Sequence, residues 1–137
     1  MLFRSRSPAR GLELASLLHA KLPVRTEFVE WRDTYPVPPA TDILVHATSV
    51  GLYEPEARVA VHLDSLRPGM VVADVIFSPP RTRLIRDAEA RGCRTIDGLG
   101  MIVNQGVVSI EYWTGTSPDP AVMRHAVEKA LELSASR

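Results

Sequence analysis

Short apolar runs alternate with segments of helical periodicity along the chain, and this alternation constrains the fold more than any other feature. Asp42–His46 and Met70–Phe77 are compact apolar runs of the kind that parallel sheets bury. Leu14, Leu17 and Leu18, in contrast, recur at the spacing of an amphipathic helix. A chain that alternates strands and helices in this way is expected to form an α/β fold with a mostly parallel sheet.

Local signals set the expected boundaries of these elements. Ser7 and Pro8 suit the N-cap and the first position of a helix. Gly92 is expected to stop a helix, and the prolines within residues 36–39 require a loop. The expected strands cover residues 1–4, 24–30, 42–46, 70–77 and 93–96, and the expected helices cover 8–21, 82–90, 101–113 and a segment that begins at 117–120.

Composition and charge exclude several classes of protein. The 16 basic residues balance the 16 acidic residues, whereas a surface for nucleic acid or anionic lipid usually needs a basic excess. No apolar run approaches the roughly 20 residues of a membrane span. The single cysteine, Cys93, cannot form an internal disulfide, which fits the cytoplasm. The histidines show no metal-ligand spacing, so no metal site is expected.

The segment Asp97–Gly106 carries the most specific chemical signal. Gly98 and Gly100 allow a backbone to approach a ligand closely, and the helix that follows presents a favourable N-terminus to polar or anionic groups. Gln105 falls on the same apolar helix face as Met101 and Val108. A buried amide without a partner costs roughly 1–3 kcal/mol. Gln105 is therefore expected to bind either a backbone group or a ligand, and its spacing leaves both alternatives open.

Four collinear segments resemble the shikimate dehydrogenase family, and together they cover nearly the whole chain. Asp97–Gln105 is similar to the family's Gly-Gly-Met segment, which ends in a substrate-binding glutamine. Ser5–Arg10 resembles the Asn-Arg-Thr-x-x-Arg segment, and Asp42–Gly51 resembles the Asn-Ala-Thr turn. Asp74–Thr82 resembles the Asp-x-x-Tyr-x-Pro-x-x-Thr segment.

The resemblance implies a Rossmann-like, doubly wound domain that binds NADP. It implies the reaction of 3-dehydroshikimate and NADPH to shikimate and NADP, in the biosynthesis of aromatic amino acids, with shikimate, quinate or a related hydroxy acid as substrate. A non-catalytic domain that binds a nucleotide or a partner protein is the alternative.

The same resemblance assigns the adenosine 2′-phosphate of NADP to Arg6 and Arg10. Guanidinium groups hold a phosphate dianion well. Ser5 and Ser7 are expected to donate hydroxyl hydrogen bonds to that phosphate. No acidic residue of the kind that binds the ribose hydroxyls of NAD stands at residues 5–7. The alternative is a solvated arginine pair at the start of a helix.

The resemblance assigns the nicotinamide half of the cofactor to residues further along the chain. Val75 and Gly98 line the nicotinamide through backbone groups, and Met101 packs on its ring. Thr48, in the segment that resembles the Asn-Ala-Thr turn, is also assigned to the cofactor. His46 stands where the family usually has the asparagine of that turn, and a structural role is expected for it.

Two residues are assigned to the substrate by the resemblance. Gln105 binds a substrate hydroxyl. Phe77 stands where the family usually has a tyrosine that touches substrate, so one hydrogen bond is lost there.

Parts of a complete enzyme are expected to be missing from this chain. A dinucleotide fold normally begins with a strand and a Gly-rich turn, and neither precedes Ser5. The missing strand belongs between the strands at 1–4 and 42–46, and the two open edges favour self-association. The family's N-terminal domain, with its catalytic Lys–Asp pair, is also absent, and neither Lys21 nor Lys129 stands in a matching context. We therefore expect residues 1–137 to form a single, partial NADP-binding domain, a fragment with no catalytic residue of its own and no activity alone.

Overall fold

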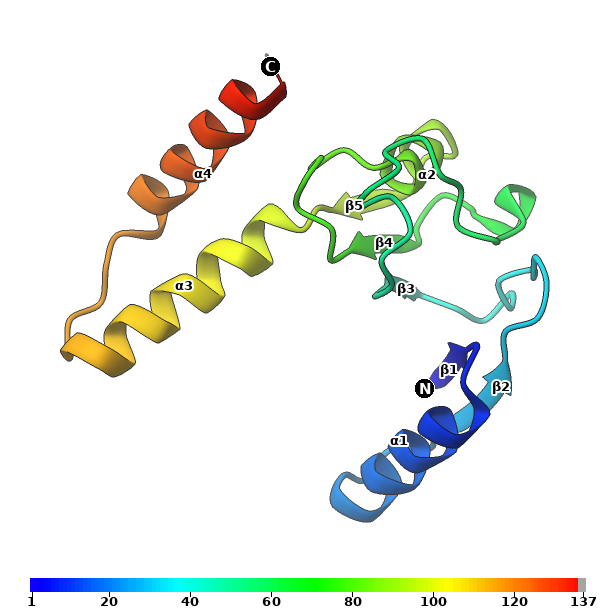
Figure 1. Ribbon diagram of the computed structural model, residues 1–137. Helices are drawn as coiled ribbons and strands as arrows, with labels where there is room; N and C mark the ends of the chain where they lie inside the picture. The colour runs from blue at the N-terminus through cyan, green and yellow to red at the C-terminus, as the bar shows by residue number, and fades with distance from the viewer. Residues whose placement is uncertain (136–137) are drawn as a thin grey trace. The chain divides into compact units, whose positions relative to one another are not determined.

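The computed structural model describes residues 1–135, and the chain divides into two compact units at the boundary between Tyr35 and Pro36. All strand pairings among the described residues are parallel, and an α-helix connects the first strand to the second and the fourth strand to the fifth. The expected α/β class with parallel sheets is confirmed (Figure 1). The strands form two separate sheets, and the expectation of one domain stays a prediction.

The first unit is a βαβ arrangement. Strand β1 (Leu2–Ser5) pairs with β2 (Glu27–Glu30), and α1 (Pro8–Lys21) connects them. Helix α1 begins at Pro8 and ends at Lys21 as predicted. Gly11 faces the ring of Phe28 so closely that a Cβ there would lie 2.1 Å from a ring carbon, which explains why glycine stands where α1 crosses the sheet.

The second unit contains a three-stranded sheet in the order β3-β4-β5. Its strands are short, and helices follow β4 and β5. The elements are β3 (Ile43–His46), a 3-10 turn (Leu63–Ser65), β4 (Val71–Asp74), α2 (Arg83–Ala90), β5 (Arg94–Ile96), α3 (Leu99–Thr114) and α4 (Pro120–Ala135).

Helix α2 covers one face of this sheet and contributes three buried side chains to the core. Val72 of β4 is completely buried, and Leu84, Ile85 and Ala88 of α2 are buried with it. Thr82 is the N-cap of α2, where its hydroxyl accepts a hydrogen bond from the Ile85 N–H, as expected for threonine at a helix start. The helix and its stop near Gly92 are confirmed.

The opposite face of the same sheet is exposed and apolar. The strand register aligns Val45, Ala73 and Ile96 in one row across this face. Ile43 and Val45 are 63% and 57% exposed. The expectation that Asp42–His46 is buried as in a sheet covered on both faces is therefore wrong for these two side chains. In residues 1–135, β3 is an edge strand, and its outward side chains keep contact with solvent.

Three predicted boundaries differ from the structure, and at two of them a side chain redirects the backbone. Strand β4 ends at Asp74 rather than near Phe77, because the Asp74 carboxylate accepts the Ile76 N–H and the chain turns there. Helix α3 begins before Gly100, since Asp97 accepts the Leu99 N–H. Strand β2 is shorter than predicted and begins at Glu27.

Helices α3 and α4 pack on each other beyond the sheet (Figure 1). Gly115, with a φ of 71°, ends α3 in the left-handed conformation that glycine tolerates best. None of the helices in the described part of the chain has the length and apolarity that a bilayer span requires.

Candidate functional site

A buried pair of polar side chains joins the carboxyl ends of β3 and β4. His46 and Asp74 are the last residues of their strands and are partners in the sheet register. The His46 Nδ1 atom lies 3.0 Å from Asp74 Oδ1, and the two side chains are 2% and 0% exposed. Because the ends of parallel strands are the usual place for ligands in α/β sheets, this pair lies where a site is expected.

Each partner extends the pair into the loop that follows its strand. His46 Nε2 lies 2.5 Å from the Thr48 hydroxyl, which accepts the Val50 N–H at 3.2 Å. Asp74 accepts the Ile76 N–H at 3.0 Å and the Thr82 hydroxyl at 2.7 Å. The network thus ties two loops and the start of α2 together.

The charge state of Asp74 follows from its partners. Burial raises the pKa of Asp74, but hydrogen bonds from His46, the Ile76 N–H and Thr82 outweigh burial and hold the pKa below its ordinary value. Asp74 is therefore an ionised acceptor at neutral pH. A neutral imidazole with its hydrogen on Nδ1 satisfies this acceptor and leaves Nε2 to accept the Thr48 hydroxyl hydrogen.

Gly98 lies directly against the backbone that follows β4. A Cβ on Gly98 would lie 2.4 Å from the Ile76 carbonyl oxygen and 2.7 Å from that of Val75. The Val75 N–H itself donates to the His46 carbonyl at 3.1 Å. The structure therefore brings Val75 and Gly98, two residues predicted to line the cofactor, into contact.

The predicted residues of α3 share one face, but that face is exposed. Met101 is 44% exposed and Val108 is 65% exposed, and Gln105 is exposed between them. Because Gln105 is exposed, the expectation that it is buried is wrong. Its side chain makes no hydrogen bond within residues 1–135, so the alternative of a backbone partner is wrong too. The reason is that α3 buries a different side, through Leu99 and Val103.

Phe77, the other residue assigned to substrate, is half-buried in the loop after β4. It lies three residues after the end of that strand, beyond the Asp74 turn.

The residues predicted to bind the 2′-phosphate lie in the first unit. Ser7 is the N-cap of α1 but its hydroxyl makes no capping hydrogen bond, and the Ser5 hydroxyl accepts the Ser7 N–H at 3.1 Å. Arg4 places its guanidinium 4.0 Å from the centre of the Tyr35 ring. Arg6 and Arg10 are exposed and form no ion pair in the part of the chain that the structure describes.

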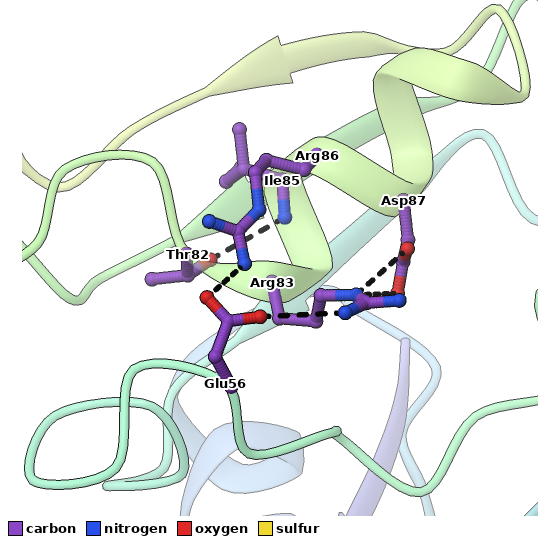
Figure 2. A network of polar contacts seen from close by, with 6 residues as sticks. All are labelled: Glu56, Thr82, Arg83, Ile85, Arg86 and Asp87. Carbon is purple, nitrogen blue, oxygen red and sulfur yellow. Dashed lines mark hydrogen bonds and ion pairs between the residues drawn. The ribbon is translucent and has the colours of Figure 1, made fainter.

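A charged cluster that sequence reasoning did not anticipate fastens the long loop after β3 to α2 (Figure 2). Glu56 accepts hydrogen bonds from Arg83 at 3.3 Å and from Arg86 at 2.5 Å. Arg83 also contacts Asp87, one turn further along α2, at 3.1 Å. The arginine spacing on α2 was visible in the sequence, but nothing in the sequence pointed to Glu56, 27 residues before Arg83. Exposed pairs of this kind contribute little stability each.

No cluster of three or more metal-ligating side chains occurs among the residues described. Cys93 is buried, and burial raises the pKa of its thiol, which donates a hydrogen bond to the Arg67 carbonyl.

Comparisons with known proteins identify relatives of this chain. Residues 98–128 match the family described as shikimate 5′-dehydrogenase C-terminal domain. The shikimate dehydrogenase (NADP(+)) of Pyrococcus abyssi is 40% identical over 124 residues, which are 90% of this chain and 43% of that protein. The chain thus spans less than half the length of this relative.

Two solved structures have the same fold. The ligand-free 5-ketofructose reductase of Gluconobacter sp. strain CHM43 is 43% identical with a TM-score of 0.89, over 94% of this chain and 47% of that chain. A shikimate dehydrogenase in complex with NADP+ is 28% identical with a TM-score of 0.79, over 95% of this chain and 46% of that chain. On the family match, the identity to curated relatives and these structural likenesses, the chain belongs to the shikimate dehydrogenase family, whose C-terminal domain it matches.

Proposed function

We propose that this chain is the NADP-binding part of a shikimate dehydrogenase-type oxidoreductase of the cytoplasm. The observation that carries the proposal is the contact of Gly98 with the Val75–Ile76 backbone at the carboxyl ends of the parallel strands. Glycine there lets the start of α3 pack directly on the backbone that follows β4, the segment that contains Val75. Proteins named shikimate dehydrogenase (NADP(+)) are among its relatives.

The proposed phosphate site consists of Arg6 and Arg10 with the hydroxyls of Ser5 and Ser7. Two exposed guanidinium groups that form no ion pair among the described residues retain their capacity to bind an anion. Both lie at the start of α1, where the helix dipole and the free N–H groups also favour negative charge. The group that distinguishes NADP from NAD is the 2′-phosphate, so these residues are proposed to set the cofactor preference.

The proposed nicotinamide site consists of Val75, Gly98, Met101 and Thr48. When bound, NADP carries the hydride that is exchanged with the substrate carbon. Val75 and Gly98 offer backbone groups to the ring, and the exposed Met101 side chain packs on it. The Thr48 hydroxyl, in the loop that follows β3, is a further polar contact for the cofactor. These side chains hold and orient the ring.

For the substrate, we propose a shikimate-like hydroxy acid held by Gln105, with Phe77 as an apolar contact. The exposed and uncommitted amide of Gln105 supports this assignment, since no interaction within residues 1–135 competes for it. The enzyme then reduces 3-dehydroshikimate with NADPH to shikimate and belongs to aromatic amino acid biosynthesis.

A second candidate is the reduction of a keto sugar. The 5-ketofructose reductase is more similar to this chain in sequence and in structure than the NADP-bound shikimate dehydrogenase is. Phe77, in place of the usual tyrosine, is consistent with a substrate other than shikimate. In a complete enzyme, comparing turnover of 3-dehydroshikimate and 5-ketofructose decides between the two candidates.

The nucleotide-binding function is testable on the 137-residue chain itself by amide chemical-shift mapping with adenosine 2′,5′-bisphosphate and with 5′-AMP. We expect the bisphosphate to shift the amides around Arg6 and Arg10, and 5′-AMP to shift them much less. Full NADP is expected to add shifts at Val75 and Gly98. The proposal is contradicted if both adenosine ligands shift these amides equally, or if neither ligand shifts the amides of residues 5–10.

A further inference from the structure

The pair of His46 and Asp74 has no stated task in the function proposed above, although it lies among the residues assigned to the nicotinamide. We propose that His46 is a positioning residue for the cofactor. Its imidazole fixes the Thr48 hydroxyl on one side and, through Asp74, the Val75–Phe77 segment on the other. This inference rests on the proposed function, because it concerns how the same site acquires its shape.

The imidazole of His46 makes two separate polar contacts, one through each ring nitrogen. Nδ1 is 3.0 Å from Asp74 Oδ1, and Nε2 is 2.5 Å from Thr48 Oγ1. Only a side chain with polar atoms at both ring positions makes both contacts. An asparagine at position 46 ends near the Nδ1 position and reaches Asp74 alone, whereas a glutamine reaches the Nε2 position and Thr48.

A neutral His46 that carries its hydrogen on Nδ1 satisfies all the contacts of the network. Asp74 is an acceptor only, so His46 donates from Nδ1, and the Thr48 hydroxyl donates to Nε2 while it accepts the Val50 N–H. The opposite tautomer places a lone pair against the Asp74 carboxylate. The proposal therefore requires the Nδ1–H tautomer, which is an observable.

The network acts on the loops more than on the core. Its contacts beyond the strand ends fix Thr48, Val50 and Ile76, which belong to no helix or strand. Most of the apolar core under α2 is built from residues outside the network, Val72 and Ile85 among them, and the buried Ile76 belongs to both. Loops are the parts of a structure that unfold locally at the lowest free energy, so they become mobile first when their hydrogen bonds are removed. Loss of His46 should therefore loosen the nicotinamide site before it unfolds the unit.

The test uses His46→Asn, His46→Gln and Thr48→Val in the 137-residue chain. We expect His46→Asn and Thr48→Val each to weaken NADP binding about tenfold, the loss that one hydrogen bond corresponds to. The double variant should bind no worse than either single one, because both remove the same contact. His46→Gln should recover most of the affinity. Binding of adenosine 2′,5′-bisphosphate, which lacks the nicotinamide, should change by less than about twofold, since it does not contact this site.

Two outcomes overturn the proposal outright. Long-range ¹H–¹⁵N spectra that show the Nε2–H tautomer of His46 contradict the network. Equal loss of NADP and bisphosphate binding in His46→Asn, accompanied by a lower melting temperature, shows that His46 only supports the fold.

Failure of the proposed function gives a different pattern. If the unaltered chain binds neither ligand, the nucleotide site is refuted, and the network is still tested by amide exchange at Val50 and Ile76. Protection that is lost in His46→Asn supports the positioning role, and fast exchange in the unaltered chain contradicts it.

Discussion

The Cα of Gly98 packs on the Ile76 carbonyl so tightly that a single added methyl group would lie 2.4 Å from that oxygen. This contact joins the start of α3 to the end of β4, and the φ of Gly98, −76°, is one that any residue adopts. Glycine is therefore required at position 98 because there is no room for a Cβ atom, and not because of the backbone conformation.

Gly98→Ala is predicted to destabilise the chain by about 1–3 kcal/mol, as overpacking does, and to weaken NADP binding. Gly100→Ala is the matched control, because a Cβ there meets only an Arg124 nitrogen at 3.9 Å and alanine favours a helix. Urea unfolding of the two variants measures the difference. Equal stability of both would show that the backbone relaxes around position 98.

The double variant Arg6→Ala/Arg10→Ala is predicted to lose affinity for NADP and to keep its affinity for NAD. Each charge-assisted contact contributes on the order of 1.5–3 kcal/mol. Isothermal titration with both cofactors measures the effect. Arg25→Ala is the control, since this arginine is also exposed and lies in the same unit. A similar loss for NAD and NADP would assign the two arginines to the fold.

Gln105→Ala is predicted to leave the melting temperature unchanged, because the side chain is exposed and makes no hydrogen bond within residues 1–135. In a complete enzyme the same change should raise KM for the hydroxy-acid substrate about tenfold, for one neutral hydrogen bond. KM for NADP should stay nearly constant. A lower melting temperature with both KM values altered would contradict a substrate role.

Asp74→Asn is predicted to lower stability at neutral pH and to flatten the loss of stability in acid. The folded-state pKa of Asp74 is lowered, so its contribution is complete above the unfolded value of about 4 and disappears as the pH falls through the folded pKa. Urea unfolding between pH 7 and roughly pH 2.5 measures the difference between variant and unaltered chain, which should shrink in acid. Glu56→Gln, an exposed carboxylate, is the control. A difference that stays constant with pH would contradict the ionised Asp74.

The chain alone is predicted to show no shikimate-dependent formation of NADPH. Hydride transfer needs a group that takes the hydroxyl proton, and Lys21 and Lys129, exposed on α1 and α4, are assigned no part in the site. A spectrophotometric assay at 340 nm tests this. Turnover at roughly 1 per second or more, ordinary for an enzyme, would require a catalytic base within this chain.

Local signals predicted the elements well because they act through neighbouring residues. Pro8 at the start of α1 and Thr82 as the N-cap of α2 are examples, since each role depends on a few adjacent backbone groups. The resemblance assigned Val75 and Gly98 to the nicotinamide, and this assignment stays a prediction, whereas their contact with each other was not predicted.

Long-range pairing was the part that the sequence left open. His46 and Asp74 are 28 residues apart, and only the strand register brings them together. The burial of Gln105 was predicted wrongly because periodicity identifies a helix face but not what covers it. The exposure of Ile43 and Val45 has the same origin, since edge and centre strands can share one apolar pattern.

The bare apolar row of Val45, Ala73 and Ile96 also determines how the isolated chain should melt. Side chains that already contact solvent in the folded state add nothing to the surface that unfolding exposes. The m-value, which is the dependence of the unfolding free energy on denaturant concentration, is proportional to that surface. The heat-capacity increment should fall below the usual value of about 12–15 cal/mol/K per residue for the same reason. We therefore expect a shallow, broad unfolding transition, because only one face of the sheet is buried in the folded state.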